Sequence, residues 1–224
     1  MSSRPVVVAF DIIETVFSLE SLRGRLEAEG ASGDVLELWF ARSLRDAFAM
    51  AATGKFAPFR EVLKASLADT LQERGVVAGA DALDRVLHGF TELDPHPDAL
   101  EAFSHLHQAG IRILALSNGA ASATEALLER GGLRHLVERV VSVDEVGLAK
   151  PRREVYQHAA RLAGVEPAAM TLVAAHPWDV HGARAAGLGG AYVERGPAYP
   201  PFLLAPDAEA HSLIGIARAL AARA

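Results

Sequence analysis

Short apolar runs, rich in β-branched residues and bounded by turn signals, divide the chain into an alternating pattern. The runs cover residues 6–10, 111–117, 138–143, 170–175 and 190–194. Each run is largely apolar and does not alternate strictly with polar residues, which is typical of strands buried on both faces of a parallel sheet. The pattern therefore predicts an α/β domain with a doubly wound parallel sheet.

Helical patterns occupy the spaces between these runs. They cover residues 96–110, 122–132, 153–164 and 179–190. The first ends in Gly110, a residue type that commonly ends helices. The second begins with Ser122, and Glu125 follows three residues later, as in a capping box. Strands that alternate with helices in this way predict helices on both faces of the sheet.

Residues 18–92 break this rhythm, because they contain helical stretches and no convincing strand. Two prolines within residues 93–99 mark the return of the first pattern. We therefore predict a core domain of residues 1–17 and 93–224, and a helical cap of residues 18–92 inserted after the first strand. Open parallel sheets bind ligands at the carboxyl ends of their strands, so this cap is expected to cover that edge.

Composition and charge exclude several classes of function. The 224 residues carry a formal net charge of -6 and no basic run, which argues against nucleic acid or a membrane surface as a partner. Cysteine is absent, so disulfides, thiolate catalysis and thiolate metal sites are excluded. The first apolar run is too short for a secretory signal, and no stretch approaches the roughly 20 apolar residues of a membrane span. We expect a cytoplasmic protein that acts on a small molecule.

Polar side chains follow four of the predicted strands. Because the carboxyl ends of parallel strands meet at one edge of a sheet, we expect these side chains to lie together. They are Asp11 and Thr15, then Ser117 and Asn118, then Lys150, and finally His176 and Asp179. Several of these residue types also serve as ordinary turn or helix-capping residues, so their order and spacing carry more information than any single one.

Four phrases at this edge resemble the motifs of the haloacid dehalogenase superfamily, in order and at similar spacing. They are FDIIET (10–15), LSNG (116–119), AKP with VYQHA (149–159) and AAHPWDVHGARAAGL (174–188). The last phrase is most similar to the type II, or L-2-haloacid, dehalogenases. The resemblance spans residues 6–195 and implies a Rossmann-like core, a cap and a homodimer. It also implies a hydrolase without metal or cofactor that converts a short 2-haloalkanoate, a small organic acid, into a 2-hydroxyacid.

The same resemblance implies catalytic roles for five residues. Asp11 is expected to attack the halogen-bearing carbon and to form an aspartyl ester that water then hydrolyses. Lys150, a cation at close range, favours the ionised form of Asp11. Asp179 helps to place the hydrolytic water, and Ser117 and Thr15 orient the nucleophile or the substrate carboxylate.

A second group is expected to line or support the substrate pocket. It consists of Ile13, Phe40, Arg42, Asn118, Tyr156 and His176. Backbone N–H groups around Asn118, near a helix start, are suited to an anion. Tyr156 is expected to support Lys150. Trp39, beside Phe40 on an amphipathic helix, is interpreted as packing.

The chain departs from the family's pattern at several positions. An arginine that commonly receives the halide is replaced by Phe40, and Arg42 projects about 200° away from residue 40 on a helix. Ala174, Ala175 and His176 stand where Ser-Ser-Asn is usual. These losses leave open a non-catalytic descendant that binds an organic anion.

A phosphatase is the other alternative. Phosphatases of the superfamily typically carry Asp-x-Asp, in which the second carboxylate serves as general acid and base. Ile13 occupies that position and can neither donate nor accept a proton. Only one acidic residue, Asp179, remains in the fourth phrase, and a magnesium site needs several hard oxygen ligands. The sequence therefore favours metal-independent chemistry over a phosphatase.

Overall fold

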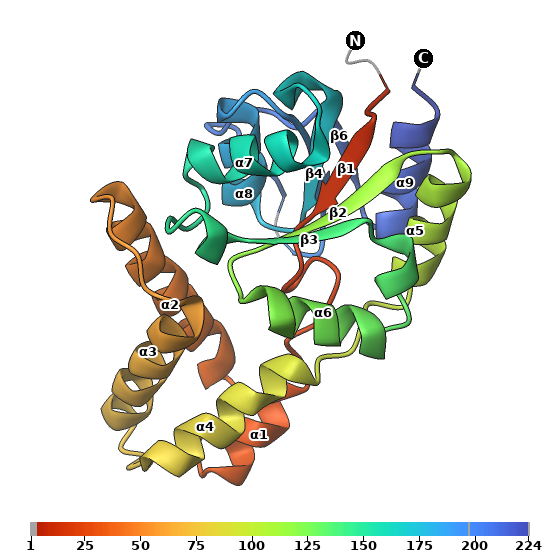
Figure 1. Ribbon diagram of the computed structural model, residues 1–224. Coiled ribbons are helices and arrows are strands. Elements are labelled where there is room, and N and C mark those ends of the chain that lie inside the picture. The colour runs from red at the N-terminus through yellow and green to blue at the C-terminus, as the bar shows by residue number, and fades with distance from the viewer. Residues whose placement is uncertain (1–3, 197, 224) are drawn as a thin grey trace.

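The computed structural model describes residues 4–196 and 198–223, and it contains one six-stranded sheet in which every pairing is parallel. The strand order is β3-β2-β1-β4-β5-β6 (Figure 1). The strands are β1 (Val7–Phe10), β2 (Arg112–Ser117), β3 (Arg139–Ser142), β4 (Met170–Ala174), β5 (Gly189–Val193) and β6 (Ala208–Ala210). The sequence predicted the first five, and the structure confirms the doubly wound parallel sheet. The short edge strand β6 was not predicted.

Helices cover both faces of this sheet. They are α5 (Ala99–Gln108), α6 (Ala121–Arg130), α7 (Arg153–Ala163), α8 (Pro177–Ala185) and α9 (Leu213–Ala221). Alternate residues of β1 explain the arrangement, because Val8 and Phe10 pack into a core with α5, α6 and α9, whereas Val7 and Ala9 pack with α7 and α8. Short 3₁₀ turns lie at Gly89–Thr91, Arg134–Leu136, Val143–Glu145 and Pro167–Ala169.

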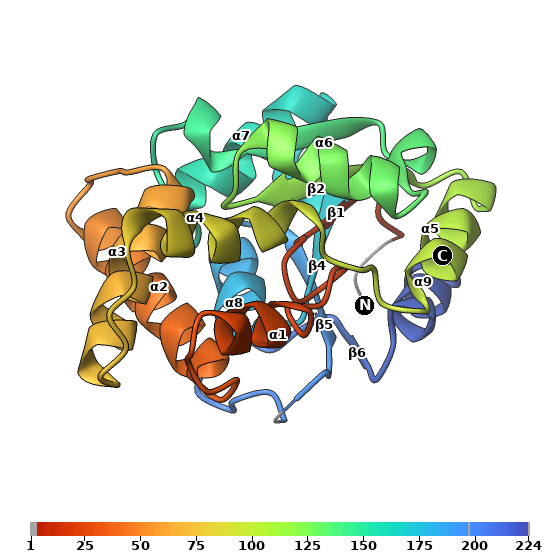
Figure 2. The same cartoon turned by 90° about the horizontal axis from the view of Figure 1, so that it is seen from below.

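A helical cap is inserted between β1 and β2. Its helices α1 (Leu22–Ala28), α2 (Val35–Ala52), α3 (Phe59–Glu73) and α4 (Ala80–His88) lie off the sheet, whereas the following α5 packs against β2 and α9. Figures 1 and 2 show these four helices grouped beyond the edge where β1 ends. The exact division at residues 17/18 and 92/93 stays a prediction, and residues 1–3, 197 and 224 of the predicted core lie outside the described residues.

The apolar interior of the cap is continuous with the apolar core on one face of the sheet. Trp39 is fully buried, donates its indole N–H to the carbonyl of Leu63 at 2.9 Å and meets Phe90 edge to face. This is the packing role that its position on an amphipathic helix indicated. In the described part of the chain, none of the helices has both the length and the apolar character needed to cross a membrane.

Two local predictions have different outcomes. Gly110 follows the last residues of α5 with a φ of 73°, a left-handed backbone that glycine adopts without steric cost. The prediction that Ser122 caps α6 was wrong. The helix begins one residue earlier, at Ala121, with Ala120 at the capping position and no side-chain cap. Ser122 therefore lies inside the first turn.

Candidate active site

Asp11 stands at the carboxyl edge of the sheet, one residue beyond β1. Its backbone N–H donates to the carbonyl of Val173 on β4 at 3.0 Å, which extends the strand pairing to this residue. The hydroxyl of Thr15 donates to Oδ2 of Asp11 at 2.7 Å, and that hydroxyl oxygen accepts the backbone N–H of Ala175 at 2.9 Å. Asp11 is therefore tied to the end of β4 through its own backbone N–H and through the hydroxyl of Thr15.

Lys150 connects the two acidic residues predicted at this edge. Its ammonium group donates to Oδ1 of Asp11 at 2.7 Å, to Oδ2 of Asp179 at 2.6 Å and to the carbonyl of Leu116 at 3.1 Å. These bonds use the three hydrogens that an ammonium group has. The lysine side chain is 0% exposed, so the ion pairs are shielded from water.

The surroundings of Asp11 favour its ionised form. Burial alone raises the pKa of a carboxyl group, but the charges of Lys150 and His176 and their hydrogen bonds outweigh burial here. The pKa of Asp11 is consequently well below its usual range. Burial lowers the pKa of Lys150, and the charges of Asp11 and Asp179 overcome that effect and raise it. Both groups are therefore charged at neutral pH, as a nucleophilic carboxylate requires.

Tyr156 contacts Asp179 and not Lys150. Its hydroxyl donates to Oδ1 of Asp179 at 2.5 Å, and both side chains are fully buried. Tyr156 therefore reaches Lys150 only through Asp179, which lies between the two. Burial, together with the charge of Asp11, raises the pKa of Asp179 despite the neighbouring lysine. Asp179 stands in the first turn of α8, where His176 occupies the capping position.

Ser117 ends β2 and Asn118 directly follows it, at the edge where the sequence placed them. The side-chain oxygen of Asn118 accepts the backbone N–H of Lys150 at 3.0 Å and so fixes the loop that carries the lysine. Ser117 Oγ accepts the backbone N–H of Gly119 at 2.9 Å. That N–H is thus already occupied, which corrects the expectation that it is available for a substrate anion. Both side chains line the pocket that contains Asp11.

The pocket beside Asp11 has a volume of about 20 Å³, room for about one water molecule. It is lined by Asp11, Ile13, Phe40, Leu44, Phe59, Ser117, Asn118, Gly119, His176 and Trp178. Ile13, Phe40 and His176 were predicted at this position. Leu44, Phe59 and Trp178 were not, although Trp178 directly precedes Asp179 in the sequence and so carried a signal.

Arg42 does not reach this pocket. Its guanidinium group pairs with Glu73 at 2.6 Å and lies 3.4 Å from the hydroxyl of Thr70, both on α3. The expectation that Arg42 lines or supports the substrate pocket is therefore not met, because Arg42 lines neither the Asp11 pocket nor its surroundings. The side chain projects away from Phe40 as helical geometry requires, and the contacts with α3 hold it there.

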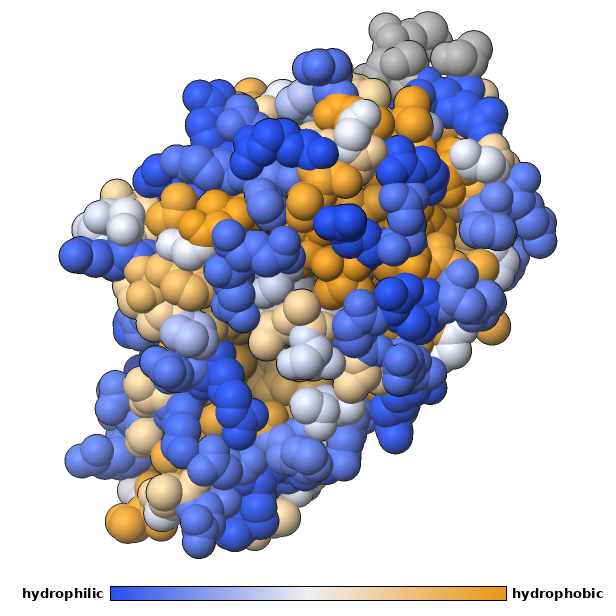
Figure 3. Space-filling view, viewed as in Figure 1, coloured by the Kyte–Doolittle hydropathy of each residue, from blue (hydrophilic) through white to orange (hydrophobic). Residues whose placement is uncertain are grey.

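An apolar chamber of about 110 Å³ adjoins the Asp11 pocket, between cap and core. The two share Ile13, Phe59, Ser117 and Gly119, and side chains from α3, α4 and α6 complete the chamber. Figure 3 shows the surface hollowed where α3 and α4 approach α6. The chamber is somewhat smaller than the roughly 150 Å³ apolar cavity that is known to hold benzene.

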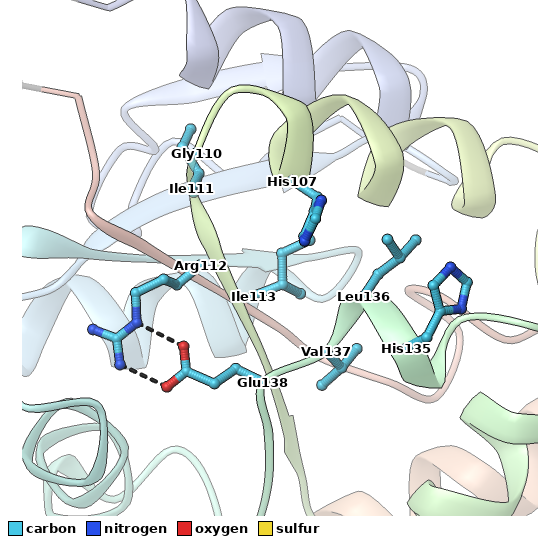
Figure 4. A pocket seen from close by; sticks show the side chains of 9 residues that line it. All are labelled: His107, Gly110, Ile111, Arg112, Ile113, His135, Leu136, Val137 and Glu138. Atoms are coloured by element: carbon cyan, nitrogen blue, oxygen red, sulfur yellow. Dashed lines mark hydrogen bonds and ion pairs between the residues drawn. The ribbon is translucent and has the colours of Figure 1, made fainter.

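A different hollow lies at the opposite end of β2 and β3. It has a volume of about 320 Å³, and its lining includes His107, Ile113, His135 and an ion pair between Arg112 and Glu138 (Figure 4). Apolar surface framed by hydrophilic side chains is visible over these strands in Figure 3. None of the predicted site residues lies in this hollow.

Fold and site together define a hydrolase-like α/β domain with a cap over a buried carboxylate. A family model described as haloacid dehalogenase-like hydrolase matches residues 6–187, so the chain belongs to that family. It is 30% identical over 166 residues to (S)-2-haloacid dehalogenase 1 of Pseudomonas sp. (strain CBS-3), covering 74% of this chain and 73% of that one. It is 30% identical over 190 residues to (S)-2-haloacid dehalogenase of Xanthobacter autotrophicus, covering 84% of this chain and 74% of that one.

Structural similarity extends over nearly the whole chain. The L-2-haloacid dehalogenase of Xanthobacter autotrophicus, solved with chloropropionic acid covalently bound, superposes with a TM-score of 0.90. The two are 26% identical, and the match covers 98% of this chain and 100% of that one. The chain is therefore an L-2-haloacid dehalogenase-like hydrolase, as its motifs predicted.

Proposed function

We propose that this protein hydrolyses a short 2-haloalkanoate to a 2-hydroxyacid through an ester on Asp11. The observation that carries the proposal is the buried, ionised carboxylate of Asp11, which faces a small pocket lined largely by apolar and aromatic side chains. One carboxylate oxygen attacks carbon 2 of the substrate, and the halide leaves with the bonding electron pair. Water then attacks the ester carbonyl, which releases the 2-hydroxyacid and restores Asp11.

The neighbours of Asp11 support this chemistry. Lys150 and Thr15 hold its two oxygens, so the nucleophile is fixed before the substrate arrives. Aromatic rings of Phe40, Phe59 and Trp178 line the pocket, and the edges of such rings carry partial positive charge. We propose that these edges contact the departing halide, where the family commonly uses an arginine.

The apolar chamber suggests what the substrate carries on carbon 2. The Asp11 pocket alone holds about one water molecule, whereas the adjoining chamber has room for a short alkyl group. Both relatives described above are named for (S)-2-haloacids. We therefore expect the S enantiomer of a 2-haloalkanoate with a short alkyl chain to be preferred.

Halide release tests the proposal. Fluoro-, chloro- and bromo-2-alkanoates of both configurations are incubated with enzyme and EDTA, with Asp11→Asn in parallel. We expect release that survives EDTA and that Asp11→Asn abolishes, because an amide oxygen is a poor nucleophile. Release that requires added magnesium, or that persists in Asp11→Asn, contradicts the proposal. Phosphate release from phosphomonoesters in the same assay tests the phosphatase alternative, and unchanged rates in Asp11→Asn are what a binding protein predicts.

Metal independence stays a prediction, and the EDTA arm of that assay tests it. Among residues 4–196 and 198–223, no three His, Cys, Asp or Glu side chains form a group that could hold a metal ion. Homodimerisation through the cap is likewise a proposal, which rests on the family resemblance, and a cytoplasmic location is a proposal that rests on the composition of the chain. Light scattering at micromolar concentration tests the first, since a monomer there contradicts it.

A further inference from the structure

His176 lies between two carboxylates. Its Nδ1 is 3.1 Å from Oδ2 of Asp11, and its Nε2 is 2.8 Å from a carboxylate oxygen of Glu14. Trp178 stacks on the ring at a centroid distance of 5.2 Å, and Phe40 lies 6.2 Å away. The imidazole is thus fixed both along its polar edge and on its faces, directly beside the predicted nucleophile.

Glu14, which makes this contact, has a left-handed backbone conformation. Its φ is 63°, which makes it the one non-glycine residue with a positive φ in the described part of the chain. A left-handed conformation is sterically unfavourable for an ordinary residue. Such an outlier persists where its surroundings hold it, and at a site it justifies a functional hypothesis. Here the Glu14 N–H donates to the carbonyl of Phe17 at 2.7 Å, while its carboxylate faces His176.

Asp179 is poorly placed to handle the hydrolytic water. It is 0% exposed, one of its oxygens is held by Tyr156 and the other by Lys150, and it does not line the Asp11 pocket. His176 lines that pocket and contacts the carboxylate that becomes the ester. A base for the second half of the reaction is therefore present at His176, where the family usually has an amide.

We propose that His176 is the general base that activates water for hydrolysis of the Asp11 ester, with Glu14 as its positioning residue. This inference rests on the proposed function. The arrangement of carboxylate, imidazole and water follows the logic of catalytic triads, in which an acid orients the base and stabilises its charged form. His176 is accordingly a catalytic residue, because it touches the reacting group.

The proton balance of the cycle is as follows. In the free enzyme, burial lowers the pKa of His176, but its hydrogen bonds to Asp11 and Glu14 and their charges outweigh burial and raise the pKa to about 10. Formation of the ester neutralises Asp11, so the imidazolium loses one of its two counter-charges and releases the Nδ1 proton to solvent. The neutral ring keeps its Nε2 hydrogen toward Glu14 and turns the Nδ1 lone pair toward the ester.

Water then adds its oxygen to the Cγ atom of Asp11 while one of its hydrogens passes to Nδ1. The bond between Cγ and the ester oxygen, which joins Asp11 to carbon 2 of the substrate, then breaks. That oxygen leaves with carbon 2 and takes the proton of the new carboxyl group. The products are the 2-hydroxyacid, the Asp11 carboxylate and the His176 imidazolium. Over both steps, one haloacid and one water molecule give one hydroxyacid, one halide ion and one proton.

A second hollow gives water and protons a route to this base. It has a volume of about 360 Å³, room for several water molecules, and lies where Glu14, His96, His176 and Arg195 meet. The charged or titratable groups around His176 and its partner Asp11 therefore include Glu14, Lys150, His96 and Arg195. The cations among them favour release of the imidazolium proton once Asp11 is esterified.

A rapid-quench experiment on His176→Asn tests the proposal. With (S)-2-chloropropionate we expect one equivalent of chloride per active site, followed by turnover at least about 100-fold slower than in the unmodified protein. Intact-protein mass spectrometry should show the ester accumulating. His135→Asn, at the far end of the sheet, is the matched control and should turn over normally without ester.

The outcomes separate the inference from the function it rests on. Turnover of His176→Asn within about threefold of the control, without ester, overturns the inference alone. Folded His176→Asn that releases no chloride in the first turnover also overturns it, because the residue then acts before the ester forms. No halide from the unmodified protein instead overturns the proposed function.

Glu14→Gln provides a second variant that keeps the backbone and the side-chain size. We expect it to accumulate ester as well, with a smaller loss of rate than His176→Asn shows. A purely structural role for Glu14 predicts a lower melting temperature and an unchanged fraction of ester. The same measurement decides the question if His176→Asn does not fold.

Discussion

The ammonium group of Lys150 lies 2.7 Å from Oδ1 of Asp11, and no part of the lysine side chain reaches solvent. Asp179 shares the same cation at 2.6 Å. Two buried carboxylates thus depend on one lysine for their charge compensation.

Lys150→Met should destabilise the protein severely. The substitution leaves two buried carboxylates without a cation, and removing one partner of a buried ion pair costs about 3–5 kcal/mol. Urea denaturation at neutral pH measures the free energy of unfolding. Lys55→Met, an exposed lysine on the loop after α2, is the control and should stay within about 0.5 kcal/mol of the unmodified protein. Equal losses in the two variants would contradict the prediction.

Tyr156→Phe should lower the free energy of unfolding by about 1–3 kcal/mol, because it leaves a buried oxygen of Asp179 without its donor. Chemical denaturation of both proteins gives the difference. Tyr199→Phe removes a hydroxyl that donates to the carbonyl of Leu204 in an exposed setting, so its cost should be smaller. The reverse order of the two losses is the outcome that argues against a structural role for Tyr156.

Ala123→Leu should change substrate preference without affecting the chemistry. Ala123, on α6, lines the apolar chamber, so a larger side chain there fills the space in which we expect the alkyl group on carbon 2 of the substrate to bind. We expect kcat/KM for 2-chlorohexanoate to fall about tenfold, which corresponds to about 1.4 kcal/mol, while 2-chloropropionate is little affected. Ala126→Leu, on the exposed side of the same helix, is the control. Equal effects on both substrates contradict the assignment of the chamber.

The stability of the protein should depend on pH through His176. Its pKa of about 10 in the folded protein exceeds the ordinary value of 6.5, because its bonds to Asp11 and Glu14 outweigh burial. The folded state therefore binds this proton more tightly, and the stabilisation is complete below pH 6.5 and lost as pH rises toward about 10. Urea denaturation across this interval should show a steeper decline for the unmodified protein than for His176→Asn. Parallel curves rule the linkage out.

The strand-end residues were predictable because two simple rules act together. Fully apolar runs mark buried parallel strands, and parallel strands end at a common edge. Asp11, Ser117, Lys150 and Asp179 therefore meet in the structure although the sequence separates them by as many as 168 positions. Their contacts follow from topology, which a pattern of apolar residues can encode.

The edge strand β6 and the helix α9 were not predicted from the sequence, for different reasons. The edge strand β6 is three residues long, with Glu209 exposed at its centre, so no apolar run marks it. The helix α9 did carry a signal, because Ser212 caps it by accepting the Gly215 N–H and apolar residues follow. No apolar pattern could have predicted β6, whereas the cap at Ser212 and the apolar residues after it were sufficient to predict α9.

The pair of Glu14 and His176 lay beyond sequence reasoning. The two residues are 162 positions apart, and their contact requires a left-handed backbone at Glu14 that its residue type does not favour. The apolar chamber was equally hidden, since its walls come from cap helices and from α6. Such features arise from side-chain packing between segments that are distant in the sequence. The local pattern of apolar and polar residues does not predict that packing.

Trp178 contacts both the cap and the core of the protein. Its ring meets Phe48 of the cap at 4.9 Å, stacks on His176 and lies 5.9 Å from the ammonium group of Lys150. The other tryptophan, Trp39, is enclosed within the cap. Separating the cap from the core would break the contact between Trp178 and Phe48, but not the hydrogen bond between Trp39 and Leu63, because both of the latter lie in the cap. The intrinsic fluorescence of Trp178 is therefore expected to report whether cap and core are in contact.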